Sequence, residues 1–249
     1  MSASARLAPI LAITFGAAAA QAGDIAEHRI LGFTPDGAVF AFEEFGVQDG
    51  SGFPYSNIYV VDTGADSWLP GTPFRVRLDD ETKPLAEARA EARRQAAPLL
   101  GKIGLDDRAV VLAASPLGEF ESDPLGTAFG EPFPSHPLQN PPDRRYRADI
   151  ELFDAETPGQ DCETFIGDGK PQGFRLKIAN LTSNAEAVLH EDGGDIPRSR
   201  GCPITYRIET VAVPAGYPAK TVAVVLSILR PGFEGPDRRF LAVTGELPQ

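Results

Sequence analysis

The chain has 249 residues, with 35 acidic residues against 23 lysines and arginines, so its formal net charge at neutral pH is −12. Such an acidic chain repels nucleic-acid phosphates and anionic lipid surfaces, although it is compatible with affinity for cations. We therefore predict no nucleic-acid partner. The length suits one large domain or two small ones, and the sequence predicts one because no low-complexity linker separates two cores.

Residues 1–22 have the pattern of a secretory signal peptide. Arg6 is their only charged residue, an apolar run follows it, and residues 20–22 supply the small residues of a cleavage site. The alternative is an uncleaved anchor, but the run is shorter than a membrane-spanning helix needs. We expect an exported, soluble chain, periplasmic or secreted, in which residues 23–249 form one domain with no integral membrane segment.

The stretch from Ile30 to Asp62 predicts three short apolar strands separated by two turns. In the first turn, residues 35–37, Pro presets φ, Asp hydrogen-bonds to its own backbone and Gly accepts a positive φ. The second turn, residues 48–54, is rich in Gly and Asp. The pattern indicates a β-meander.

An amphipathic helix is predicted over about residues 84–97, after a strand at residues 74–78 in which apolar and charged residues alternate. Thr82 is the expected helix cap, and the apolar residues recur at helical spacing: Leu85, Ala88, Ala92, Ala96 and Leu99. Pro98 removes a backbone donor, so the regular helix is expected to end near Ala97. Its charged side is expected to face solvent, with a partner-binding helix as the alternative.

Further strands are predicted along the rest of the chain. Residues 108–113 form a short β-branched run, and apolar and polar residues alternate over three ranges: 145–152, 174–178 and 204–209. Residues 221–229 are nearly all apolar, which predicts a central strand buried on both faces. Residues 118–144 are rich in proline and are interpreted as a surface excursion. The predicted fold is mainly β: an antiparallel sandwich or stacked small blade-like sheets with one amphipathic helix.

The two cysteines, Cys162 and Cys202, predict a disulfide, because an exported chain with an even, small number of cysteines usually pairs them. Two free buried thiols are the alternative. No CxxC motif is present, so neither cysteine is interpreted as catalytic.

The motifs of familiar active sites are missing from the sequence: it has no GxSxG elbow, HExxH, P-loop or GxGxxG after a strand. No catalytic residue and no cofactor are predicted. The three histidines lie far apart in sequence. The run His190-Glu191-Asp192 is interpreted either as a polar loop or as a ligand or base cluster.

Carboxylates are the remaining candidates for a site. Glu43 and Glu44 end a predicted strand next to Asp49, while Glu234 and Asp237 lie in a C-terminal turn whose sequence echoes that of residues 32–42. If the turns converge, these five residues form a candidate ligand-binding site, for Ca²⁺ or as acid and base of a hydrolase. The alternative is turn chemistry with pairing to nearby arginines.

Two resemblances extend these patterns. Residues 32–37, 40–42 and 57–62 resemble one blade of the propeller repeat in Tol-type periplasmic proteins, although a propeller needs several blades. Over nearly the whole exported chain, the segments 42–55, 198–203 and 230–238 resemble a family of bacterial predicted secreted proteins, domain of unknown function 2259. That resemblance implies secretion and brings no activity or catalytic residue with it.

Export, acidity and the lack of a catalytic motif favour a non-catalytic module of the periplasm, either binding or envelope-associated. Its expected partner is an unknown envelope protein or a small ligand. A carboxylate-dependent hydrolase and a calcium-stabilised structural domain are the two alternatives.

Overall fold

The computed structural model describes residues 23–106, 108–115, 123–131, 144–167, 169–216 and 218–249. These residues form three antiparallel sheets of 5, 4 and 4 strands, together with two α-helices and one 3-10 turn. The predicted mainly-β, antiparallel fold is confirmed. The predicted signal peptide lies outside the described residues.

The N-terminal sheet contains the predicted meander. Its order is β1-β2-β3-β4, and β5 also pairs with β3. The bounds are β1 Glu27–Phe33, β2 Val39–Val47, β3 Pro54–Asp62, β4 Ser67–Trp68 and β5 Phe74–Arg77. The turn before β2 has the expected chemistry, because Thr34 and Ala38 both donate to the Asp36 carboxylate and Gly37 has a φ of 74°.

The central sheet has the order β13-β12-β11-β6, with β6 Val110–Ala114, β11 Thr205–Val213, β12 Thr221–Pro231 and β13 Pro236–Glu246. The prediction of a strand buried on both faces is confirmed by β12. Val224 and Leu226 pack toward one neighbouring sheet, while Ala223 and Val225 pack toward the N-terminal sheet. This alternation explains the continuous apolar run, because neither side of the strand meets water.

The outer sheet has the order β10-β9-β8-β7, with β7 Gly126–Glu131, β8 Arg144–Asp154, β9 Gln172–Asn180 and β10 Glu186–Glu191. Strand β7 corrects the expectation of a surface excursion over residues 118–144. It pairs with β8, and its Phe129 stacks on Tyr146 in the core. The prolines on either side conceal this strand in the sequence, and residues 116–122 and 132–143 lie outside the described part of the chain.

Helix α1, Leu85–Ile103, packs on the outer face of the N-terminal sheet through Ala88, Ala92 and Ala96. The expected end near Ala97 is wrong. Pro98 is exposed, and the turn beyond it buries further apolar side chains, so packing outweighs the missing hydrogen bond. The helix ends instead at Gly104, whose φ of 65° suits a left-handed cap.

The expected Thr82 cap is also wrong. Pro84 is the residue at the cap position, without a side-chain hydrogen bond to the helix. The Thr82 hydroxyl donates to Asp80 at 2.7 Å. That short-range bond in the preceding turn holds the hydroxyl away from the first helical amides.

The predicted disulfide between Cys162 and Cys202 is confirmed, with a Cα–Cα distance of 5.4 Å. It joins the short helix α2, Cys162–Ile166, to the segment that follows the 3-10 turn η1, Arg198–Arg200. Helix α2 has only 5 residues, too few for an apolar periodicity to show in the sequence.

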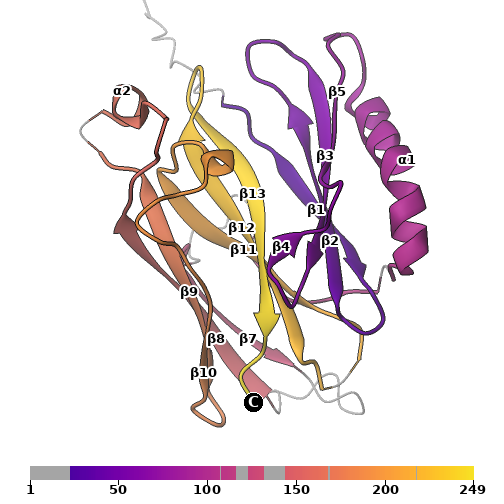
Figure 1. Cartoon of the computed structure of the whole chain (residues 1–249), viewed down its shortest axis with the longest axis vertical. Coiled ribbons are helices and arrows are strands. Elements are labelled where there is room, and N and C mark those ends of the chain that lie inside the picture. Colours follow the sequence, from indigo (N-terminus) through magenta and orange to yellow (C-terminus); the bar gives the residue numbers. More distant parts are fainter. Residues whose placement is uncertain (1–22, 107, 116–122, 132–143, 168, 217) are drawn as a thin grey trace, which may run out of the picture.

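Figure 1 shows the four layers in order: the outer sheet, the central sheet, the N-terminal sheet and helix α1. One apolar core lies between the outer and central sheets, a second between the central and N-terminal sheets, and a third beneath the helix. The N-terminal and C-terminal parts of the chain therefore build adjacent sheets. Strand β13 is an edge strand of the central sheet. Its outer edge is therefore not paired with another strand of that sheet.

Candidate functional site

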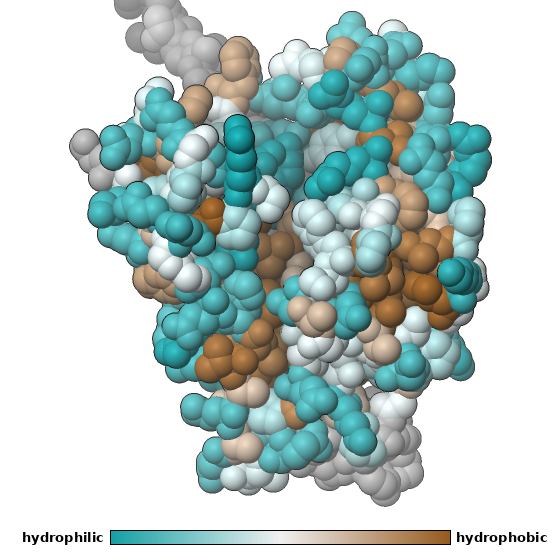
Figure 2. Space-filling view, viewed as in Figure 1, coloured by the Kyte–Doolittle hydropathy of each residue, from teal (hydrophilic) through white to brown (hydrophobic). Residues whose placement is uncertain are grey.

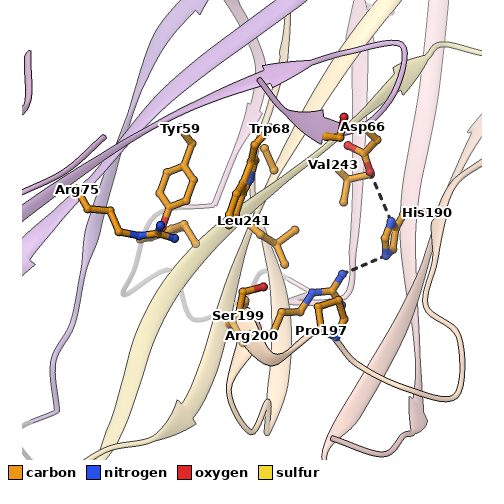
Figure 3. Close-up of a pocket in the computed structure, with 14 residues that line it drawn as sticks. Tyr59, Asp66, Trp68, Arg75, His190, Pro197, Ser199, Arg200, Leu241 and Val243 are labelled. Atoms are coloured by element: carbon orange, nitrogen blue, oxygen red, sulfur yellow. Dashed lines mark hydrogen bonds and ion pairs between the residues drawn. The ribbon is translucent and has the colours of Figure 1, made fainter. Parts of the chain in front are cut away.

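A slot of about 390 Å³ lies beside the outer edge of β13. Its floor is the segment Phe240–Val243 of β13, one wall comes from β3, β4 and β5, and the other comes from the segment around η1. Figure 3 shows Tyr59, Trp68 and Arg75 on the first side, and Ser199 and Arg200 on the second. Figure 2 shows this face hollowed near its centre, between the surface over the outer sheet and the surface over the N-terminal sheet.

The first wall presents an exposed aromatic ring. Trp68 is the only tryptophan in the chain, and it stays 45% exposed although it lines a concavity. The Tyr59 ring supports it at a centroid distance of 5.6 Å, and the Arg75 guanidinium lies 5.4 Å from its centre. These contacts hold the indole in place while one part of it faces the slot.

The end of the slot opposite Arg75 is closed by a network that joins all three sheets. Asp66 has a positive φ of 45° in the turn between β3 and β4, and it accepts hydrogen bonds from the Thr244 amide at 2.8 Å and hydroxyl at 3.0 Å. His190 on β10 places Nδ1 3.5 Å from Asp66 and Nε2 3.0 Å from Asp192. Arg200 donates to both oxygens of Asp192, at 2.7 and 2.6 Å.

This network fixes the charge of His190. Hydrogen bonds with Asp192 and Asp66 raise its pKa to about 9, so the imidazole is protonated at neutral pH. Burial alone would raise the pKa of Asp192, but hydrogen bonds from His190 and Arg200 outweigh it and hold that pKa below its usual value. Arg200 Nη2 also lies 3.2 Å from Nε2 and works to lower this pKa, but the two carboxylates outweigh it. In the protonated form both ring nitrogens carry a hydrogen, so His190 has no free lone pair for a general base.

Every second amide of β13 points to its outer edge, and three of these amides have an acceptor there. Arg238 N donates to the Asp24 carbonyl at 2.9 Å, Phe240 N to Glu44 Oε2 at 2.7 Å and Thr244 N to Asp66 at 2.8 Å. Because β13 pairs with β12 in continuous register, the amide of Ala242 points to the same outer side. None of the described residues accepts a hydrogen bond from it there. The slot floor therefore offers one free backbone N–H and carbonyl pair.

A second concavity of about 360 Å³, the arginine pocket, shares Arg75 with the slot. Its other arginines are Arg77, Arg230 and Arg239. Arg239 is held by Asp24 and Arg77 by Asp79. Among the described residues, Arg230 has a single ion pair, with Asp237 at 3.8 Å, and burial lowers its pKa. Arg75 forms no ion pair with any described residue, so positive charge faces this pocket although the whole chain is acidic.

The predicted candidates Glu43 and Glu44 face opposite sides of β2, as neighbouring strand residues must. Glu43 is 0% exposed beneath helix α1, where Arg89 Nε donates to it at 2.9 Å and Arg93 Nη2 at 2.8 Å. Burial works to raise the pKa of Glu43, but the arginines hold it below its usual value. Glu44 faces the central sheet, and burial raises its pKa.

The other three candidates lie near the hairpin tips at one end of the molecule. A side-chain carbon added at Gly50 would lie 3.7 Å from the Phe233 ring, so the tip that carries Asp49 touches the tip that carries Glu234. Asp237 accepts a hydrogen bond from Asp24 N at 3.1 Å. The two turns with similar sequences lie apart. Gly37, at the first turn, packs beside Pro214 and Thr221, whereas the second turn follows the opposite end of β12.

These five carboxylates thus separate. Glu43 pairs with arginines of α1, Glu44 accepts hydrogen bonds from Asn57 and the Phe240 amide, and the other three lie near the hairpin tips. In the described ranges, no group of three or more His, Cys, Asp or Glu side chains is arranged to hold a metal ion. Ligand binding by the five carboxylates stays a prediction.

Sequence reasoning missed the slot. Trp68 lies in a strand of 2 residues, which is too short to show any periodicity. The alternation of β5 predicts only that Arg75 faces solvent. His190 and Glu191 end strand β10 and Asp192 follows it, with Glu191 turned away to pair with Arg175. The one available signal was a lone tryptophan in an exported chain, which on its own does not specify a position in space.

Comparison with known protein families gives a match over most of the chain. The profile of a family described as "Predicted secreted protein (DUF2259)" covers residues 41–246. No curated protein matches the chain. Among the described residues, no helix is both long and apolar enough to span a membrane. The matched range includes every residue that lines the slot.

Proposed function

Because the chain belongs to the DUF2259 family of predicted secreted proteins, we propose that it is a non-catalytic binding protein of the periplasm that holds a small ligand in the slot beside Trp68. The volume of about 390 Å³ is within the range of small-molecule sites. The slot also combines apolar floor residues with a few polar groups, which is the usual composition of such sites.

The exposed ring of Trp68 is the observation that carries this proposal. An indole that is 45% exposed in a concavity leaves apolar area in water, and a ligand stacked on it removes that area. Tyr59 and Arg75 already hold the ring, so little side-chain entropy is lost when a ligand binds.

The lack of catalysis is supported by the state of the groups near the slot. His190 and Ser199 both line the slot, but His190, as an imidazolium between two carboxylates, does not accept a proton from a serine at neutral pH. Asp192 is held by Arg200, and Asp66 is held by Thr244. Both acidic groups thus already take part in hydrogen bonds or ion pairs that hold the fold together.

Trp68 supplies its own assay, because all tryptophan emission of the protein comes from the slot. We expect a library of organic acids, capped amino acids, sugars and nucleotides to contain compounds that change this emission saturably and raise the melting temperature. A Trp68→Ala variant is expected to lose the rise in melting temperature, whereas Phe165→Ala, at an exposed position on α2, is expected to keep it. A library that leaves both readouts unchanged would contradict the proposal.

A further inference from the structure

The free edge of β13 indicates what kind of ligand the slot accepts. We propose that the slot binds an extended peptide segment that carries a carboxylate, with its backbone paired to Ala242 and its carboxylate at Arg75. This inference rests on the proposed function and names its ligand class.

The backbone part of the inference follows from the way β13 uses its outer edge elsewhere. Ile25 forms a parallel bridge with Arg238 on that edge, through Ala26 N to the Arg238 carbonyl at 3.3 Å and Arg238 N to the Asp24 carbonyl at 2.9 Å. Ala242 lies four residues further along and presents the same N–H and carbonyl pair toward the slot. An added strand satisfies such a pair, as in β-strand addition to a sheet edge.

The side chains that flank Ala242 limit the pairing to a short segment. The Glu44 carboxylate occupies the amide of Phe240, and Asp66 occupies the amide of Thr244. These carboxylates protect the rest of the edge from long strands of other chains, a common protection for edge strands. One ligand residue therefore pairs with Ala242, and its two neighbours continue along the slot over roughly 10 Å of extended chain.

The charge of the ligand follows from the arginines at the open end of the slot. Arg75 has no carboxylate partner among the described residues and lies where the slot and the arginine pocket meet. Arg230 is partly buried, and its one ion pair within the described part of the chain is 3.8 Å long. A ligand carboxylate beside Arg75 forms the ion pair that this guanidinium lacks among the described residues. Trp68, next to Arg75, packs against the apolar part of the same ligand residue.

Three capped tripeptides test the proposal on the purified protein. The probe acetyl-Glu-Val-Glu-amide places a carboxylate on either side of the pairing residue, so it serves both strand directions. Acetyl-Lys-Val-Lys-amide reverses the charge. The Glu peptide with N-methyl groups on Val and on the Glu that follows it removes the backbone donor to the Ala242 carbonyl in either strand direction, because a parallel pairing uses the amide after the pairing residue, as Ala26 does for Arg238. Binding is followed by Trp68 emission and by calorimetry, with Arg75→Gln as the variant and Arg94→Gln, on the exposed face of α1, as its matched control.

We expect the Glu peptide to bind saturably, and both the Lys peptide and the N-methylated peptide to bind at least tenfold more weakly. Arg75→Gln is expected to remove the preference for Glu over Lys, while Arg94→Gln keeps it. Equal binding of the methylated and parent peptides would overturn the pairing with Ala242 but leave a ligand-binding slot. Failure of all three peptides while another compound changes Trp68 emission would overturn the ligand class alone, and failure of every compound would overturn both proposals.

Discussion

Replacing His190 by glutamine tests the network that joins the three sheets. His190 contacts Asp66 from the N-terminal sheet side and Asp192 beside β10, and Arg200 lies 3.2 Å from its Nε2. Its pKa is raised to about 9 in the folded chain, against about 6.5 for an unperturbed histidine. Protonation therefore stabilises the folded state, and that contribution is complete below pH 6.5 and lost as pH rises through 9.

The size of the contribution follows from the two pKa values. It amounts to about 3 kcal/mol at pH 6, about 2 kcal/mol at pH 7.5 and close to zero at pH 10. Glutamine does not titrate, so it removes the dependence on pH while keeping a hydrogen-bonding side chain of similar reach. The difference in free energy of unfolding between the wild type and His190→Gln is expected to fall by about 3 kcal/mol between pH 6 and pH 10.

Urea unfolding at pH 6, 7.5, 9 and 10, followed by circular dichroism, measures this difference. His28→Gln is the control, because burial lowers the pKa of His28 and its linkage with stability lies below pH 6.5. That variant is expected to show the wild-type trend above pH 7.5. A difference between the wild type and His190→Gln that stays constant with pH would refute the charged network.

Three further predictions concern the stability of the fold. Arg89→Met is expected to lower the free energy of unfolding by about 3 kcal/mol, because it leaves the buried carboxylate of Glu43 with one fewer arginine partner. Arg94→Met, at a side chain that is 75% exposed, is expected to change the free energy of unfolding by under about 0.5 kcal/mol. Ala92→Leu adds volume to the packed contact between helix and sheet and should lower the free energy of unfolding in urea by about 1–3 kcal/mol, while Ala90→Leu, on the exposed side, should not. Equal effects of the two substitutions would contradict the packing of this helix face on the sheet. Reducing the disulfide, which spans 40 residues, should cost about 3–4 kcal/mol, and an unchanged urea midpoint with reductant would contradict this.

The elements that the sequence predicts best are those with a clear period or an unbroken apolar run. Strand β12 is recognised because both of its faces are buried, and β8 and β9 because their faces alternate. The short strand β4 and the short helix α2 are missed, since neither is long enough to show a period. Helix α1 continues past Pro98 because packing against the sheet outweighs the local rule.

The candidate site is less predictable because it depends on contacts between distant segments. The slot joins Trp68 from the N-terminal sheet, Ala242 from the central sheet and Arg200 from η1. No spacing in the sequence brings these residues together. Glu43 and Glu44 look alike in the sequence, and only the layers on either side of β2 make one a partner of Arg89 and the other a partner of Phe240.

The central claim is that β13 offers a free backbone pair at Ala242, within the slot, for a ligand to join. Amide hydrogen exchange measured by NMR tests it directly, residue by residue. In the free protein, Ala242 is expected to exchange at least tenfold faster than Phe240 and Thr244, whose amides donate to Glu44 and Asp66. Adding acetyl-Glu-Val-Glu-amide is expected to slow Ala242 selectively. An Ala242 amide that is as protected as its neighbours in the free protein would contradict the account.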